Sequence, residues 1–280
     1  MTVSAVIIAK NEEENLQRCL ASLSWCDDIL VVDDHSSDGT VEVARGFGAR
    51  VLTNRFTSFA DQRNFALASE ELRHAWVLML DADEASTPEF RDAVLNAIEN
   101  ASESTVAFRT CRKTIFLNRW LKYSDGYPVW IMRLVRVGRA RFVSSGHGEV
   151  AIPPVDGQIG TIRAPFLHYP FSKGFVHWAH RHVDYAEREA KLESAHAPLA
   201  LRDFGGLFSI RKEVRRSSLR SISRWLPGRL LLRFFYQYVV KLGFLDGRAG
   251  LIFCCMMAGY EGLIRLFSIE LQCKFENKDR

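Results

Sequence analysis

Two aspartates at the end of an apolar run are the residues whose spacing points most clearly to chemistry. The segment LMLDADE places Asp81 and Asp83 two positions apart, directly after a stretch that predicts a buried strand. Two carboxylates this close repel each other in water-poor surroundings unless a cation neutralises them. Hard oxygen ligands suit Mg²⁺ or Mn²⁺, and either ion can hold a substrate diphosphate at the same time. The alternative is that both aspartates only cap the following turn.

Polar residues also follow two other apolar runs. The run 3–9 leads into Asn11, and the run 28–32 leads into Asp33 and Asp34. Ligands of open parallel sheets bind beyond the carboxyl ends of the strands, so we expect these side chains to share one edge with the LMLDADE aspartates. No Gly-x-Gly-x-x-Gly turn follows the first run, which argues against a dinucleotide-binding dehydrogenase.

The elements that must position these residues follow from hydrophobic periodicity. Short β-branched runs alternate with helical stretches, which predicts an α/β fold with a mostly parallel sheet flanked by helices. The expected strands are 3–9, 28–32, 49–53 and 75–80, and the expected helices are 12–23, 40–47 and 58–72. A Ser-x-x-Asp capping box opens the third helix at Ser58, and Thr87 with Pro88 opens a fourth. Beyond residue 105 we expect antiparallel strands at 106–111 and 130–137, then a helix over 174–195.

Charge is divided unevenly along the 280 residues. Residues 1–105 hold 8 Lys/Arg against 19 Asp/Glu, and residues 106–280 hold 29 against 14, although the net charge is only +4. An acidic half suits a site that gathers a divalent cation. A basic half suits phosphate-bearing partners, such as anionic lipid or a lipid-linked acceptor.

Cysteine content and the first residues bear on the compartment. The six cysteines form no Cys-x-x-Cys pair and have no His at zinc-ligand spacing, so we expect reduced thiols rather than a disulfide framework or a structural zinc. The first fifteen residues lack the features of a signal peptide, so we expect the protein not to be exported.

The region after about residue 200 has a different composition. Arg229, Arg233, Gln237 and Lys241 recur every four residues through an apolar segment, which on a helix gives one polar stripe and a broad apolar remainder. A basic stripe at Lys212, Arg216, Arg220 and Arg224 precedes it, which favours peripheral or monotopic attachment to an anionic membrane surface. The apolar run 251–271 contains Glu261 and Arg265 at pairing distance, so we expect it not to span the bilayer. The alternative is a helical hairpin, turned at Asp246 and Gly247, that packs on the catalytic domain or forms a homo-oligomer. No aromatic stacking motif supports nucleic-acid binding.

Four segments in order, AVIIAKNEEENLQRCLASL, VVDDHSSDGT, DQRNFAL and LMLDADE, resemble family 2 glycosyltransferases with a GT-A fold. The resemblance covers roughly residues 1–200. Within the family, YPVWIMRLVR followed by SGHGEV and PFLHYPF most resembles bacterial lipopolysaccharide inner-core β-glucosyltransferases. It implies a nucleotide-binding half at 1–105, an acceptor half at 106–200 and a membrane-associated tail at 201–280.

The resemblance also implies roles for individual residues. The implied nucleotide-sugar ligands are Asn11, Glu13, Asp33, Arg63, Asn64 and Asp81, although Asn11 has the alternative role of a helix cap. The implied metal ligands are Asp81, Asp83 and His168. Glu149 is the candidate catalytic base and Asp125 its reserve, while Arg133 and His147 are expected to contact acceptor or phosphate. The chain departs from the family pattern in two places: Gly146 to Glu149 replaces Val-His-Glu, and Val129 replaces an Asp after Tyr-Pro.

The function implied by this resemblance is inverting transfer of a sugar, expected to be glucose, from a UDP-sugar to a lipid-linked saccharide. Such transfer needs a divalent cation and a base for the acceptor hydroxyl. The expected place is the cytoplasmic face of the bacterial inner membrane. Two alternatives remain: a sugar-phosphate nucleotidyltransferase, which normally has a glycine-rich phosphate loop that KNEEEN does not resemble, and a non-catalytic nucleotide-binding membrane scaffold.

Overall fold

A computed structural model describes residues 2–145, 148–152, 154, 156–194 and 228–276, with isolated positions at 205, 209, 214 and 218. The chain forms two compact units, Met1–Phe175 and Val176–Arg280. The units separate near the start of helix α5 (Gly174–Ser194), and the functional division expected near residue 200 stays a prediction.

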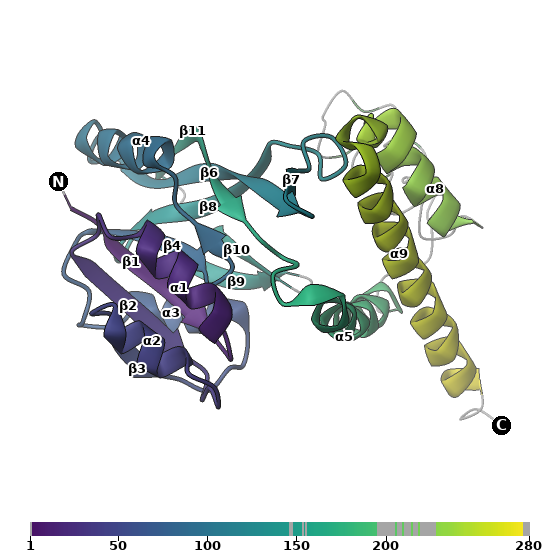
Figure 1. The fold of residues 1–280 in the computed structure, drawn as a ribbon, viewed down its shortest axis with the longest axis horizontal. Coiled ribbons are helices and arrows are strands. Elements are labelled where there is room, and N and C mark those ends of the chain that lie inside the picture. Colours follow the sequence, from purple (N-terminus) through teal and green to yellow (C-terminus); the bar gives the residue numbers. More distant parts are fainter. Residues whose placement is uncertain are drawn as a thin grey trace. The chain divides into compact units, whose positions relative to one another are not determined.

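The first unit is built on one mixed, mostly parallel sheet (Figure 1). Its parallel part follows the order β3-β2-β1-β4, from Arg50–Thr53, Asp28–Asp33, Ser4–Ala9 and Trp76–Asp81. The order continues β8-β6-β11-β5, from Val129–Arg136, Thr105–Phe116, Gln158–His168 and Glu84–Ala85. The short β7 (Arg119–Trp120) pairs with β6, and β9 (Arg141–Ser145) with β10 (Gly148–Ile152). The predicted α/β, GT-A-like fold class is confirmed.

Helices follow the parallel strands as the sequence predicts. They are α1 (Glu13–Ser22), α2 (Thr40–Gly46), α3 (Phe59–Leu67), α4 (Pro88–Glu99) and α5 (Gly174–Ser194). The Ser58 hydroxyl accepts from the Asp61 amide and the Thr87 hydroxyl accepts from the Phe90 amide, so both predicted caps are confirmed.

Two expected helix ends differ from the structure. Helix α3 ends at Leu67 rather than at 72, where the Ser69 hydroxyl accepts from the Glu71 amide and offers the backbone a local alternative to helix. Helix α1 has Glu12 at its N-cap with no side-chain cap bond. The cap alternative for Asn11 is therefore wrong.

Apolar side chains fill both faces of the central strands. On β4, Leu78 and Leu80 belong to one buried cluster, while Val77 and Met79 belong to the cluster on the opposite face. A strand buried on both faces reads as a continuous apolar run, which is why its end was recognisable from the sequence. The chain meets its first acidic side chain of this strand at Asp81.

The second unit contains a helical hairpin. Its helical segments are α8 (Arg229–Phe235), a π-helical turn (Tyr236–Val240), a 3₁₀ turn (Gly243–Asp246) and α9 (Gly247–Glu276), so the expected turn near Asp246 and Gly247 is present. Glu261 pairs with Arg229 at 2.6 Å. Within the described residues, Gly243–Lys274 is long and apolar enough to cross a membrane by length and composition. The predicted basic stripe at Lys212, Arg216, Arg220 and Arg224 lies outside the described residues.

Asp28, the first residue of β2, links this strand to β1 and β3 through its side chain. Its carboxylate accepts from the Ser4 hydroxyl of β1 (2.5 Å) and the Arg73 amide (3.0 Å), and it pairs with Arg50 of β3. Burial alone would raise the pKa of Asp28, but these hydrogen bonds and the guanidinium lower it.

We predict that Asp28→Asn lowers the free energy of unfolding by about 2–3 kcal/mol at pH 7, because charge-assisted bonds are lost. A lowered pKa in the folded state stabilises the protein above the unfolded pKa, and this contribution is lost as the pH falls through the folded pKa. The difference from wild type should therefore shrink below about pH 4. Urea denaturation at several pH values measures this. Asp27→Asn, which alters an exposed pair with His74, is the control; equal losses for both variants would contradict the account.

Candidate active site

Asp81, the last residue of β4, lies between two buried guanidiniums. Its Oδ1 is 2.6 Å from Arg63 of α3, and its Oδ2 is 2.6 Å from Arg133 of β8. Both arginine side chains are almost fully buried. Burial would raise the pKa of Asp81, but Arg133 and Arg63 hold it well below its usual range. Asp81 therefore carries its charge, and both of its oxygens are engaged by the protein.

Glu84 is a member of this cluster that the sequence analysis missed. Its side chain is fully buried, its Oε1 lies 2.6 Å from Arg133, and its Oε2 accepts from the Asp81 amide. Burial raises the pKa of Glu84, and Arg133 only partly offsets this effect. The available signal was the third acid of LMLDADE, two positions before the Thr87 cap of the next helix.

Asp83 and His168 are brought together from distant parts of the chain. His168 Nε2 lies 3.6 Å from Asp83 Oδ2, and both side chains are mostly buried. His168 Nδ1 is buried and has no hydrogen-bond partner within the described residues. Strand β11 aligns the pair, because His168 is in register with Glu84 and the next amide, of Tyr169, donates to the Asp83 carbonyl.

The Asp83–His168 pair has the chemistry of a partial metal site. Carboxylate oxygen and neutral imidazole nitrogen both bind Mn²⁺, and Mg²⁺ usually takes only one or two protein carboxylates and fills its shell with water and phosphate oxygens. In the described part of the chain, no group of three or more His, Cys, Asp or Glu side chains is placed to hold a metal. A cation here would complete its coordination with water or with oxygens of a substrate.

The loop after β2 is held by residues from the end of β1. Asn11 Oδ1 accepts from the Ser37 amide (2.8 Å), and Glu13 Oε2 accepts from the Gly39 amide (2.9 Å). Asp33 behaves differently: its Oδ2 accepts from the Ser36 amide, whereas its Oδ1 is buried with no partner in the described residues. A buried acceptor without a donor is costly, so Asp33 is suited to receive a ligand N–H or O–H.

Lys173 is a second residue that sequence reasoning missed. Its ammonium lies 2.6 Å from Glu12 Oε1 and 2.5 Å from the Asn11 carbonyl, which fastens the segment after β11 to the end of β1. Burial raises the pKa of Glu12, although bonds from Asn15 and Lys173 oppose the shift. This places a cation at the edge where the strands end.

Asn64 has a clear structural use. Its amide nitrogen donates to the Phe142 carbonyl and its oxygen accepts from the Phe142 amide, both at 2.8 Å. Both polar groups of the side chain thus hold β9 to α3. The nucleotide role implied for Asn64 stays a prediction.

Asp125 is held by a residue of β6. The Thr114 hydroxyl donates to Asp125 Oδ2 at 2.6 Å, and Thr114 of β6 is in register with His168 of β11. Neighbouring strands are about 4.8 Å apart, so Thr114, the residue that holds Asp125, lies one strand away from His168. His147 lies outside the described residues. Glu149 belongs to β10, but its side chain is also outside them, so both roles stay predictions.

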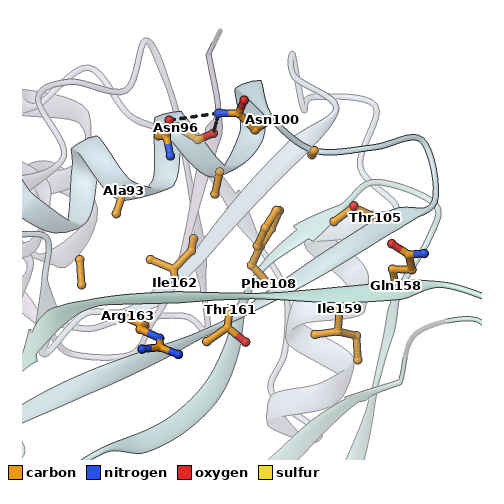
Figure 2. Close-up of a pocket in the computed structure, with 14 residues that line it drawn as sticks. Ala93, Asn96, Asn100, Thr105, Phe108, Gln158, Ile159, Thr161, Ile162 and Arg163 are labelled. Carbon is orange, nitrogen blue, oxygen red and sulfur yellow. Dashed lines mark hydrogen bonds between the residues drawn. The ribbon is translucent and has the colours of Figure 1, made fainter.

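A separate groove of about 540 Å³ lies between α4 and the first half of β11 (Figure 2). Asn96, Asn100 and Gln158 are among its polar lining residues, and the Asn100 amide nitrogen donates to the carbonyl and side-chain oxygens of Asn96. None of the predicted site residues lines this groove. The groove is therefore separate from the charged cluster at the end of β4.

We predict that Arg133→Met lowers the free energy of unfolding by about 3–5 kcal/mol. The substitution leaves the buried Glu84 without its cationic partner and removes one partner of Asp81. An acid whose pKa is raised in the folded state binds a proton more readily when folded, so the variant should gain stability as the pH falls from 7 to 5. Thermal and urea unfolding measure both effects. The Arg133→Met/Glu84→Gln double variant should be more stable than Arg133→Met alone. An additive loss would contradict the proposed pairing.

Curated relatives match the chain over part of their length. Over 175 residues it is 30% identical to the lipopolysaccharide core biosynthesis glycosyltransferase LpsC of Rhizobium meliloti (strain 1021), covering 60% of this chain and 63% of that protein. Over 93 residues it is 36% identical to the uncharacterized glycosyltransferase RT0209 of Rickettsia typhi, covering 33% and 31%. The matches thus span less than two thirds of these relatives.

Solved structures of glucosyl-3-phosphoglycerate synthase from Mycobacterium tuberculosis are also similar. The complex with phosphoglyceric acid is 15% identical, with a TM-score of 0.47 over 71% of this chain and 83% of that one. The complex with Mn²⁺, UDP and glucosyl-3-phosphoglycerate is 23% identical, with a TM-score of 0.34 over 39% and 43%.

The family assignment comes from a match to a domain model. Residues 4–145, which contain β1 to β4 and the acidic cluster, match the model described as Glycosyl transferase family 2. The match covers half of the chain. This chain belongs to glycosyl transferase family 2.

Proposed function

We propose that the chain transfers a sugar from a nucleotide diphosphate sugar to the hydroxyl group of an acceptor. The proposed active site lies at the end of β4. The observation that carries the proposal is the Asp83–His168 pair, which lies beside an arginine-braced Asp81 at the carboxyl edge of the parallel strands. Ligands of open α/β sheets bind at this edge. Membership of family 2 favours glycosyl transfer over the alternative that the chain is a sugar-phosphate nucleotidyltransferase.

A divalent cation fits this arrangement. Asp83 and His168 would hold Mg²⁺ or Mn²⁺, and the bound ion would supply positive charge to the departing diphosphate. Asp81 was expected to be a metal ligand, but its two oxygens already face arginines, so we assign it to holding Arg63 and Arg133 in place. Arg63, Arg133 and Lys173 each pair with an acid of the chain, so the bound ion would be the main source of positive charge for the leaving group.

Uridine diphosphate is the proposed nucleotide. The unpaired Oδ1 of Asp33 is suited to accept from the N–H of a uracil ring or from a ribose hydroxyl. Asn11 and Glu13 would act by fixing the loop beside Asp33, since their polar atoms bind loop amides. Arg63 and Asn64 keep their proposed place near the nucleotide.

Inverting displacement requires a base for the acceptor hydroxyl. Asp125 has support from position, because Thr114, which holds it, lies one strand from His168. Glu149 remains the other candidate. His147 keeps its proposed role in contacting the acceptor. Arg133, the other residue proposed for that role, forms ion pairs with Asp81 and Glu84.

The proposed acceptor is a lipid-linked saccharide of the bacterial cell envelope, with glucose as the proposed sugar, met at the cytoplasmic face of the inner membrane. The match to a lipopolysaccharide core glycosyltransferase supports this acceptor class. The second unit supports membrane attachment, because its hairpin exposes many large apolar side chains within a short stretch: Leu230, Leu231, Leu232, Phe235, Tyr236, Val239, Val240, Leu242, Phe244 and Leu245. A homo-oligomer through the same helices is the competing use of that surface.

We predict that UDP binds at least tenfold more tightly with Mn²⁺ than without it, and that Asp83→Asn removes this gain because it deletes a ligand. Isothermal titration calorimetry with UDP, with and without Mn²⁺, measures both. Asp92→Asn, an exposed acid of α4, is the matched control. Cation-independent binding, or an unchanged Asp83→Asn variant, would reject the metal role. Release of UDP from UDP-glucose separates an enzyme from a non-catalytic scaffold, which would bind UDP without releasing it from the sugar.

We predict that Phe244→Ser/Leu245→Ser weakens binding to phosphatidylglycerol vesicles by roughly 100-fold, because each exposed apolar side chain gives about 1.5–3 kcal/mol on burial. Vesicle flotation at several lipid concentrations measures this. Cys273→Ser, an exposed position near the end of α9, is the control. If wild type stays with the unbound protein, or if the double variant binds like wild type, the membrane role is wrong.

A further inference from the structure

One face of the extended sheet carries side chains that neither the fold nor the proposed active site uses. Side chains alternate between the two faces of a strand. In Figure 2, Phe108 and Ile162 point toward α4, whereas Thr161 and Arg163 point to the other side of β11. Arg109 shares that other side, because it is in register with Thr161 and its Nε donates to the Thr161 hydroxyl at 2.9 Å.

Cations and aromatic rings follow one another along this face. The Arg109 guanidinium lies 5.9 Å from the Trp130 ring centre, and the Lys113 ammonium lies 4.8 Å from that of Trp120. Lys122 lies 5.7 Å from the same Trp120 ring, and Tyr127 meets that ring edge-on at 5.0 Å. We call these six residues the cationic aromatic row: Arg109, Lys113, Trp120, Lys122, Tyr127 and Trp130.

The row has polar groups that the described residues do not satisfy. Lys113 forms no ion pair with a carboxylate among the described residues. It differs in this from Lys10, Lys173, Lys191 and Lys274, each of which pairs with an acid. Arg109 likewise forms no ion pair within the described part of the chain, and its hydrogen bond goes to a neutral hydroxyl.

The indole nitrogen of Trp120 is also without a partner. It is buried and forms no hydrogen bond within the described residues. A buried N–H normally finds an acceptor. Lys113 beside this unused N–H donor, with Arg109 farther along the row beside Trp130, favours an anionic ligand with acceptor oxygens, such as a phosphate or a carboxylate.

The row approaches the same end of β6 as the proposed active site, but on the opposite face of the sheet. Lys113 directly precedes Thr114, the residue that holds Asp125 and lies in register with His168. A molecule lying along the row would therefore approach the catalytic cluster around the end of β6, from the face opposite Thr114 and Asp125. The rings of Trp120 and Trp130 offer flat apolar surfaces between the cations, and Trp130 is 40% exposed.

We propose that the cationic aromatic row binds an acceptor saccharide that carries phosphate or carboxylate groups. This inference rests on the proposed glycosyl transfer and names its substrate class. The cations bind the anionic substituents, the Trp120 N–H donates to one of their oxygens, and the rings contact the apolar faces of the sugars.

Saturation-transfer NMR with mannose 6-phosphate and mannose tests the proposal. UDP and Mn²⁺ are kept at saturation so that the nucleotide site cannot accept the phosphate. We expect mannose 6-phosphate to bind and mannose to bind at least fivefold more weakly. Arg109→Gln/Lys113→Gln should weaken binding of mannose 6-phosphate at least fivefold. Trp120→Phe, which keeps the ring and removes the N–H, should weaken it by a smaller factor.

Arg91→Gln, an exposed arginine of α4, is the matched control and should bind mannose 6-phosphate like wild type. Calorimetry of UDP with Mn²⁺ should be unchanged in every row variant, which separates failure of this inference from failure of the nucleotide site. Equal binding of the two sugars, or full binding by Arg109→Gln/Lys113→Gln, would overturn the proposal. The proposal would also be overturned if the protein bound single-stranded RNA or phosphatidylglycerol vesicles but not mannose 6-phosphate, and if the row variants lost that binding.

Discussion

The structure at the candidate site depends on a balance of charge at the end of β4. Three acids lie within four residues, from Asp81 at the end of a strand buried on both faces to the fully buried Glu84, and their mutual repulsion is only partly screened by water there. Arg63 and Arg133 supply the opposing charge to Asp81 and Glu84 at 2.6 Å. Asp83 lies 3.6 Å from His168 instead, and this difference between neighbouring aspartates is the basis for the metal site that we propose.

This balance explains why the sheet must be mixed. The parallel strands β1 to β4 bring the chain to the edge where a nucleotide can bind, but none of them carries a compensating cation to Asp81. Strand β8 runs antiparallel beside β4 and delivers Arg133, and β11 pairs with β5 and delivers His168. Residues after position 105 therefore complete the charged cluster that the first four strands begin.

The parts that the sequence predicted are those with local causes. Strands β1 to β4 and the caps at Ser58 and Thr87 follow from apolar runs and from side-chain oxygens placed three residues before an amide. Arg133 could be named from the sequence, but its partners could not, because they depend on β8 pairing with a strand 52 positions earlier. Glu84 and Lys173 were missed for the same reason. Asn64 shows the converse, since a residue singled out by a motif also clamps β9 to α3.

The central claim is that the chain uses Asp83 and His168, rather than Asp81, to hold a divalent cation against a diphosphate. Anomalous diffraction from crystals grown with Mn²⁺ and UDP measures this most directly. We expect one manganese peak within about 2.5 Å of an Asp83 carboxylate oxygen and of His168 Nε2, with Asp81 still bound to both arginines. A peak coordinated by Asp81, or UDP bound with no manganese beside His168, would contradict the account.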